Sequence, residues 1–424
     1  MFSQNGLSLD QAPPISVVFR FFFAGSLFGI LTGILILLYQ TDIFNAHSVG
    51  AVTITHTLTL GVMLSFMFAA LFQMLPVIAG VTLKNPVKKA NWLQYPFILG
   101  VIALLFAFNL PQPWLFGVAS VLLGISILFI SVIMLKNLLT LPHHSASSKG
   151  MLAALLSLAA VVVLALYLTA SLAGVTEVTY YTHIKEAHYS FGLFGWIALL
   201  IIAISFQVIE MFYVTPPYPI LLSRYLPFSL LGLLLLSTII SFFNPNVWLF
   251  SNLILVVLLS TYAIVTLKRL TQKKRPLTDA TVWFWRMGLS SLLLSMLFMA
   301  LSTFTDTSSV KSLSYIFFTS FALSIVFAMF YKIVPFLTWF HLNSQGYFTA
   351  PMMHEVIHPK TAKNHLYIHL ATVVSLVISL FISVFIFFTA TLTILSFGWI
   401  TYQIIHAYKL YIKTQKTGER FLLL

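Results

Sequence analysis

Long apolar runs separated by short polar segments dominate the chain. A helix needs about 20 apolar residues to cross a bilayer, and runs of this kind can be placed twelve times. They cover 15–39, 50–80, 92–109, 113–137, 151–173, 187–213, 226–243, 246–267, 282–304, 313–338, 366–387 and 390–412. The pattern predicts an all-α polytopic protein with twelve transmembrane helices in a single membrane domain, residues 1–424.

Composition and charge agree with this prediction. Of the 424 residues, 60% are hydrophobic and 7% are charged, whereas a soluble domain carries about 25% charged residues. The net charge of +13 is typical of basic cytoplasmic loops rather than of nucleic-acid binding. Since there is no cysteine, thiolate metal sites, iron–sulfur clusters and c-type haem attachment are excluded.

Basic residues follow every second apolar run. The second run is followed by three lysines, Lys84, Lys88 and Lys89, and the eighth run is followed by a basic cluster at 268–275. Near its end the sequence has four more basic residues, Lys409, Lys413, Lys416 and Arg420. By the positive-inside rule, both termini are expected in the cytoplasm. We therefore expect a multi-pass protein of a bacterial inner (cytoplasmic) membrane, with the lipid bilayer as its main partner.

Three of the predicted helices end alike, at 69–76, 203–210 and 328–335. Each segment has a small residue, an aromatic next to a long polar residue, and Pro or Glu three positions further on. Each lies on the second helix of a four-helix block, which suggests repeats at 15–137, 151–267 and 282–412. The blocks would form three arcs about a pseudo-threefold axis. The alternative is convergent helix ends near a membrane boundary.

This arrangement resembles the catalytic subunit of the haem-copper oxidase and nitric oxide reductase superfamily. The best local match is the second run, where 56–61 reads His-Thr-Leu-Thr-Leu-Gly and 69–76 reads Ala-Ala-Leu-Phe-Gln-Met-Leu-Pro. In that superfamily, a haem-ligating histidine opens the second helix and a Gly-Ala-x-Tyr-Tyr-Leu-x-Pro-like stretch closes it. On topology alone, the chain also resembles a family of twelve-helix haem-copper proteins linked to nitric oxide and nitrite metabolism.

The resemblance implies roles for three residues. His56 would be an axial ligand of a b-type haem, and His188, which opens the sixth helix, would ligate copper or haem. Tyr315 precedes Pro335 by the spacing that separates His56 from Pro76, and tyrosine can ligate haem. The alternative for His56 is a histidine hydrogen-bonded between helices.

The chain also departs from the superfamily. The run 226–243 lacks the adjacent histidine pair that holds copper, and 313–338 lacks the His-x-His that holds two haems. It is therefore not expected to be a conventional terminal oxidase. We expect a degenerate member that binds one b-type haem, or copper, near the periplasmic side for electron transfer or for handling nitric oxide or oxygen. It would be an oxidoreductase if haem is bound, with a small redox partner or accessory subunit.

Four polar residues at the ends of the repeated helices offer another interpretation. Under the pseudo-threefold symmetry, Gln73, Gln207, Glu210 and Lys332 would form a polar ring, in which Glu210 and Lys332 pair. This ring could carry protons or ions in a metal-free transporter or assembly factor built on the same fold. The alternative is that Lys332 snorkels to the interface and Glu210 faces water.

A second histidine motif lies in the loop after the tenth run. His354-Glu355-x-x-His358 has the spacing of a zinc metalloprotease motif, in which two histidines on one helix face bind zinc. Pro359 directly after the motif threatens such a helix, and no third ligand falls at the extended-motif spacing. Zinc catalysis is therefore the least favoured of the three functions.

Overall fold

The computed structural model describes residues 13–81, 83–275, 278–305 and 307–420. Within these ranges every regular element is a helix, and an isolated bridge joins Tyr347 to Arg420. Eleven of the helical segments are long and apolar enough to span a membrane. The expectation of an all-helical polytopic membrane protein is therefore confirmed.

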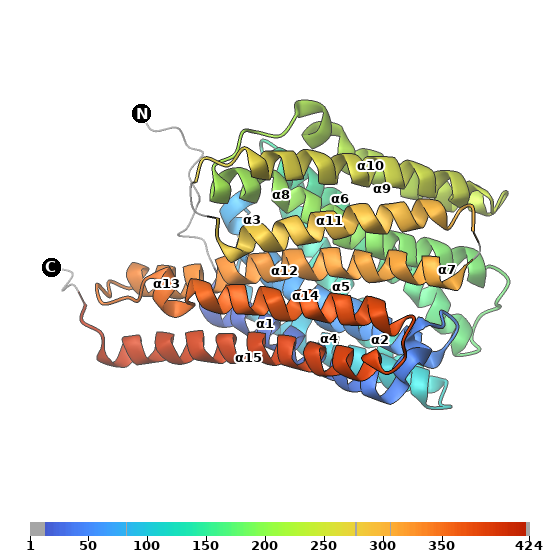
Figure 1. Ribbon diagram of the computed structural model, residues 1–424, viewed down its shortest axis with the longest axis horizontal. Helices are drawn as coiled ribbons and strands as arrows, with labels where there is room; N and C mark the ends of the chain where they lie inside the picture. The colour runs from blue at the N-terminus through green and yellow to red at the C-terminus, as the bar shows by residue number, and fades with distance from the viewer. Residues whose placement is uncertain (1–12, 82, 276–277, 306, 421–424) are drawn as a thin grey trace. The chain divides into compact units, whose positions relative to one another are not determined.

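The described chain divides into two compact units, and each is considered by itself. The first contains most of 74–276 together with 289–322. Its complete helical elements are α4 (Pro86–Asn109), α5 (Trp114–Leu139), α6 (Ala146–Leu172), α7 (Tyr181–Ser190), η4 (Phe191–Ala198), α8 (Leu199–Tyr213), α9 (Ile220–Ser241) and α10 (Val247–Thr271). Helices α9 and α10 run side by side (Figure 1).

The second unit contains 13–73, 277–288 and 323–424, as far as these are described. Its complete elements are α1 (Ile15–Tyr39), η2 (Gln40–Phe44), α2 (Val49–His56), η3 (Thr57–Leu64), α13 (Met353–Val356), α14 (Pro359–Ser379) and α15 (Phe385–Thr417). Helices α3 (Ser65–Ala79), α11 (Ala280–Leu301) and α12 (Ser308–Ser344) contribute to both units. Within the second unit, α14 and α15 lie side by side.

The twelve predicted runs fall on helical elements, with one displacement. The eleventh run was expected at 366–387, but α14 covers Pro359–Ser379 and α15 begins at Phe385. The turn between them, residues 380–384, is almost wholly apolar and contains neither Gly nor Pro, so the hydrophobic pattern runs straight through it. Helix α14 is not among the eleven candidate spans, and its first half carries several polar residues, among them Lys363, Asn364 and His365.

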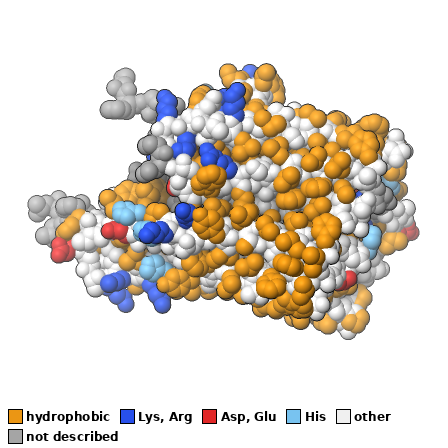
Figure 2. Space-filling view, in the orientation of Figure 1, with side chains coloured by type: hydrophobic (Ala, Val, Ile, Leu, Met, Phe, Trp, Pro, Cys, Tyr) orange, Lys and Arg blue, Asp and Glu red, His pale blue; other side chains and the backbone are white. Residues whose placement is uncertain are grey.

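Apolar side chains cover much of the length of the helices, as expected of surfaces that face lipid (Figure 2). Exposed examples include Leu99, Val121 and Ile239. Exposed lysines gather at the start of α14, at Lys360 and Lys363, and near the end of α15. The antiparallel pair therefore presents basic residues at one end.

Helices α1 and α15 pack closely because α1 carries glycines four residues apart. A Cβ at Gly29 would overlap the Phe397 ring, and a Cβ at Gly33 would overlap Ile394. Small residues at this spacing let two membrane helices approach each other, so that van der Waals packing replaces the hydrophobic effect that is missing in lipid.

The second and sixth spans are each interrupted by a π-helical segment, which the apolar pattern did not predict. The segments η3 and η4 each have eight residues and begin 134 residues apart, the same offset that separates Gln73 from Gln207. Each segment contains a glycine at the corresponding position. A Cβ at Gly61 would overlap Phe28 of α1, and a Cβ at Gly195 would overlap Ser157 of α6. Each π-helical segment therefore contains a glycine that packs tightly against a neighbouring helix.

The α1–α15 contact leads to a testable prediction. We expect Gly29→Ala to destabilise the protein by about 1–3 kcal/mol, since the added methyl must displace the Phe397 ring. Thermal unfolding in detergent would measure the loss. The matched control is Gly232→Ala on α9, where a Cβ would have no atom within 4 Å. Equal unfolding temperatures for the two variants would contradict the close packing.

Candidate functional site

His56 is the last residue of α2 and directly precedes the π-helical segment η3. Its Nδ1 lies 2.9 Å from the Val52 carbonyl oxygen, one turn earlier on the same helix. Because a carbonyl oxygen only accepts, Nδ1 must carry the proton and donate it. In the neutral ring, Nε2 is then the nitrogen with the lone pair, which is the form of imidazole that binds a metal.

His188 has the same hydrogen-bond chemistry in the other unit. Its Nδ1 lies 3.1 Å from the carbonyl oxygen of Val161 on the neighbouring helix α6, so Nε2 again carries the lone pair. His188 lies three residues before η4, whereas His56 lies one residue before η3. Both predicted ligands are thus partly buried histidines, each oriented by a backbone carbonyl and followed by a π-turn.

Tyr315 is half exposed on α12. It interacts electrostatically with Glu186 and Tyr189, which flank His188 on α7. The nearby His183 ring packs against Phe242, with 5.7 Å between ring centroids. The structure therefore brings Tyr315 to the α7 end of its unit, close to the residues around His188.

No cluster of three or more His, Asp or Glu side chains in the described parts of the chain is arranged to hold a metal ion. A copper ion held by protein ligands alone takes several such side chains. A haem iron needs only one or two axial side chains, because the porphyrin supplies the other ligands. His56 and His188 are each a single imidazole among the described residues, and their roles as haem or copper ligands stay predictions.

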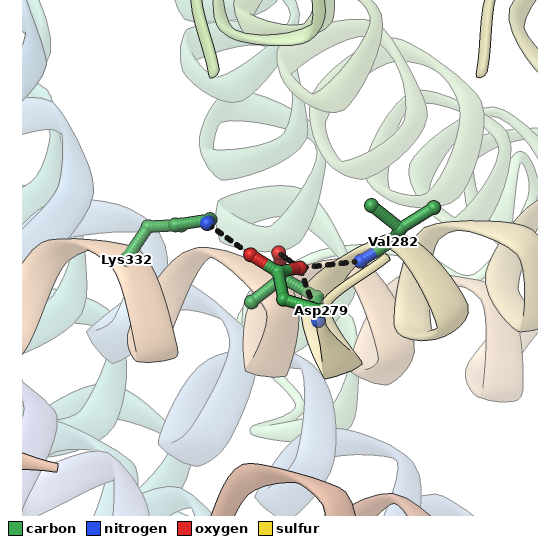
Figure 3. Close-up of polar contacts among 4 residues, drawn as sticks. Asp279, Val282 and Lys332 are labelled. Atoms are coloured by element: carbon green, nitrogen blue, oxygen red, sulfur yellow. Dashed lines mark hydrogen bonds and ion pairs between the residues drawn. The ribbon is translucent and has the colours of Figure 1, made fainter. Parts of the chain in front are cut away.

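Lys332 forms an ion pair with Asp279, which was not predicted (Figure 3). The Nζ to Oδ2 distance is 2.5 Å. Asp279 also caps the start of α11, since its Oδ1 accepts hydrogen bonds from the backbone N–H groups of Thr281 and Val282 at 3.0 and 3.2 Å. One carboxylate thus satisfies the orphan N–H groups of a helix terminus and a lysine of α12.

The environment of Asp279 sets its protonation. Partial burial raises the pKa of this carboxyl, but the Lys332 ammonium and the hydrogen bonds at the helix terminus outweigh burial and hold the pKa below its usual value. The aspartate therefore stays ionised down to unusually acid pH.

Glu210 takes a local partner in the other unit. Its Oε1 accepts a hydrogen bond of 2.9 Å from the backbone N–H of Tyr218, in the loop after α8. The Tyr218 hydroxyl in turn donates to Thr266 at 3.1 Å, and burial raises the pKa of Tyr218 to about 12. Glu210 thus anchors a loop, and its pairing with Lys332 stays a prediction.

The two glutamines of the predicted ring differ in their surroundings. Gln73 is 2% exposed, and neither its amide nitrogen nor its amide oxygen has a hydrogen-bond partner among the described residues. Gln207 is only partly buried. A buried amide without partners costs free energy, which makes Gln73 the stronger functional candidate of the two.

The His354-Glu355-x-x-His358 segment does not form one helix. Helix α13 ends at Val356, and Ile357 and His358 are extended. Glu355 accepts a hydrogen bond from the Met352 N–H at 2.7 Å, and His358 Nδ1 accepts one from the Lys360 N–H at 3.1 Å, which caps α14. The two histidines therefore do not share a helix face, and the geometry gives no support to zinc catalysis.

Helix α14 carries two histidines, His365 and His369, for which the sequence predicted no role. His365 and His369 are 0% and 2% exposed, whereas His47, His354 and His358 are exposed. The signal that could have found them is their four-residue spacing at the polar start of an apolar run, which places both on one face of a helix.

Comparison with known proteins adds no further constraint. No family model matches the chain, and no curated protein matches it.

The Asp279–Lys332 ion pair predicts a pH dependence. Because the folded pKa of Asp279 lies below the unfolded value of about 3.9, the pair stabilises the fold above that pH and loses its effect as the pH falls through the folded pKa. Asp279→Asn keeps a helix-capping side chain but removes the charge. We expect it to be less stable than wild type at pH 7 by about 1 kcal/mol or less, because the pair is partly exposed.

Thermal unfolding at pH 7 and at pH 3 tests this prediction. The difference between wild type and Asp279→Asn should shrink at pH 3, because this pH lies below the unfolded pKa of about 3.9, so that protonation of the unfolded chain offsets part of the stabilisation. A difference that stays the same at both pH values would mean that the ion pair does not contribute.

Proposed function

We propose that the chain is a twelve-helix inner-membrane protein that binds one b-type haem through His56, with His188 as the second candidate ligand. The helices would form three four-helix repeats of the haem-copper oxidase type, with both termini in the cytoplasm. The haem would serve electron transfer or the handling of nitric oxide or oxygen, and a small redox partner or accessory subunit would exchange electrons with it.

One observation carries this proposal. The Nδ1 proton of His56 is held by the Val52 carbonyl at 2.9 Å, and this bond fixes both the ring orientation and the tautomer. Hydrogen bonds of this type hold metal-bound histidines in place and raise the basicity of the coordinating nitrogen. The Val161 carbonyl does the same for His188 at 3.1 Å.

The π-turns support the same proposal. Single π-helical turns within α-helices are rare and occur often at functional sites. Here one follows each candidate ligand, and both have the same length and the same glycine position. A π-turn shifts the residues on either side relative to a regular helix, so it is a means of setting the direction of the preceding histidine.

A bound haem would supply a redox-active iron and, where one axial position stays open, a site for a diatomic gas. The residues of this chain would supply an imidazole ligand and the carbonyl that orients it. His183, Glu186 and Tyr315 place polar groups near His188.

The absorption spectrum of the purified protein tests the proposal. We expect a reduced-minus-oxidised difference spectrum with b-type haem bands and a haemochrome yield close to one haem per chain. His56→Ala should abolish the bands or shift them strongly. The matched control is His47→Ala, since His47 is exposed and should leave the spectrum unchanged.

A colourless protein from cells well supplied with haem would overturn the proposal and favour a metal-free transporter or assembly factor. The observation that favours this second function is Gln73, a buried amide without a partner among the described residues. In that case Gln73→Leu should abolish the transport or assembly activity, while the protein still folds.

A further inference from the structure

An exposed stripe of side chains runs along α15 and changes in character from apolar to basic. Residues seven apart lie two turns apart on the same face of a helix. At this spacing the exposed residues of α15 are Phe388, Leu395, Tyr402, Lys409 and Lys416. A Cβ at Gly398, between Leu395 and Tyr402, would have no atom within 4 Å, so no neighbouring helix covers the middle of the stripe.

Helix α15 is longer than a bilayer is thick. Its 33 residues correspond to about 50 Å at a rise of about 1.5 Å per residue, whereas the hydrocarbon core is about 30 Å thick. With the first turn of α15 at one side of that core, Lys409 lies about 36 Å further along the helix. This is beyond the opposite side of the core, so the lysines reach the level of the lipid headgroups.

The face of α15 that carries Tyr411 and Gln415 is tied to the loop after α12. Gln345 donates a hydrogen bond of 2.8 Å to the Tyr411 hydroxyl, and Gln415 donates one of 2.9 Å to the Gln345 amide oxygen. The Tyr347 hydroxyl donates to the Gln415 carbonyl at 2.9 Å. These contacts keep the last turns of α15 helical, so the spacing of the lysines is fixed before a ligand binds, which lowers the entropic cost of binding.

The lysines at this end lack acidic partners. Lys409, Lys413 and Lys416 are exposed, and none of them forms an ion pair with an acidic residue in the described part of the chain. Lys409 and Lys413 lie one turn apart, where like charges repel each other. An anion bound between them removes this repulsion.

A surface hollow of about 470 Å³ lies at the same place. Its volume is within the range of about 300–1,000 Å³ that is common for ligand-binding clefts. The side chains that line it are those of Tyr408, Lys409, Ile412, Lys413, Lys416 and Thr417. The hollow therefore combines three ammonium groups with a tyrosine hydroxyl, all of which can donate hydrogen bonds to an anion.

The two halves of the stripe define the class of ligand. The apolar half, at Phe388 and Leu395, lies at the level of acyl chains, and the basic half lies at the level of phosphate groups. Lysine binds phosphate as a point charge, and basic residues next to a membrane span attract anionic lipids. A zwitterionic headgroup fits less well, because it brings its own cation close to the three lysines.

We propose that the lysine end of α15 binds one anionic phospholipid. Its phosphate lies in the hollow between Lys409, Lys413 and Lys416, and its acyl chains lie along the stripe at Leu395 and Tyr402. The site shares no residue with the proposed haem site and does not depend on it.

Native mass spectrometry of the full-length protein in a non-ionic detergent tests this site, with phosphatidylglycerol as the probe. We expect wild type to bind one phosphatidylglycerol more tightly than any further copies and more tightly than phosphatidylcholine. The triple variant Lys409→Gln, Lys413→Gln, Lys416→Gln should bind that first phosphatidylglycerol at least about tenfold more weakly, since each lysine near an anionic lipid contributes about fivefold.

The matched control is the triple variant Lys84→Gln, Lys88→Gln, Lys89→Gln, which removes the same charge at the start of α4. It should bind the first phosphatidylglycerol as tightly as wild type. An equal loss in both triple variants would overturn the proposal, as would phosphatidylcholine binding as tight as that of phosphatidylglycerol. Displacement of the lipid by an equal concentration of soluble glycerol phosphate would also overturn it, because the site would then recognise free phosphate.

Discussion

Polar groups in this molecule must find partners within the protein, because lipid offers none. Most hydroxyls solve the problem locally. Thr57, for example, donates to the Thr53 carbonyl one turn earlier at 2.8 Å, as Ser157 does to Ala153 at 2.9 Å. The side chains that cannot be satisfied in this way are long or carry rings, and they are the ones that mark candidate sites.

The candidate haem ligands show how a backbone carbonyl can prepare a side chain for chemistry. His56 and His188 each give the Nδ1 proton to a carbonyl, in one case on the same helix and in the other on the neighbouring helix. The result is the same tautomer, with the lone pair on Nε2.

The π-turns also bear on the proposed ancestry of the chain. Two helices that began as copies would keep the same irregularities at the same offset, and η3 and η4 do so. The third proposed copy, α12, is α-helical from Ser308 to Ser344 and has Tyr315 in place of a histidine.

The sequence predicted where the helices lie, but it did not predict the turn between α14 and α15 or the two π-helical segments. Apolar runs located α1 to the residue, from Ile15 to Tyr39, because a membrane span is defined by its length and hydropathy. They missed the turn at 380–384, which is as apolar as the helices on either side, and the π-turns, which change hydrogen bonding but not composition.

The site residues were predictable only in part, for a related reason. Histidines within apolar runs stand out by type, which is why His56 and His188 are the candidates, and their role as ligands stays a prediction. The partner of Lys332 was not predicted, since Asp279 precedes α11 by one residue and is 53 residues away in sequence. Partners that come from distant segments are fixed by tertiary packing, which one sequence does not display.

The decisive measurement is electron spin-echo spectroscopy of the oxidised, purified protein, which detects nitrogen nuclei bound to a paramagnetic iron. If His56 Nε2 binds haem iron, protein labelled with ¹⁵N-histidine should show an axial imidazole coupling that is absent from His56→Ala. A ferric haem signal without histidine coupling, or one with the same coupling in His56→Ala and His188→Ala, would contradict this assignment.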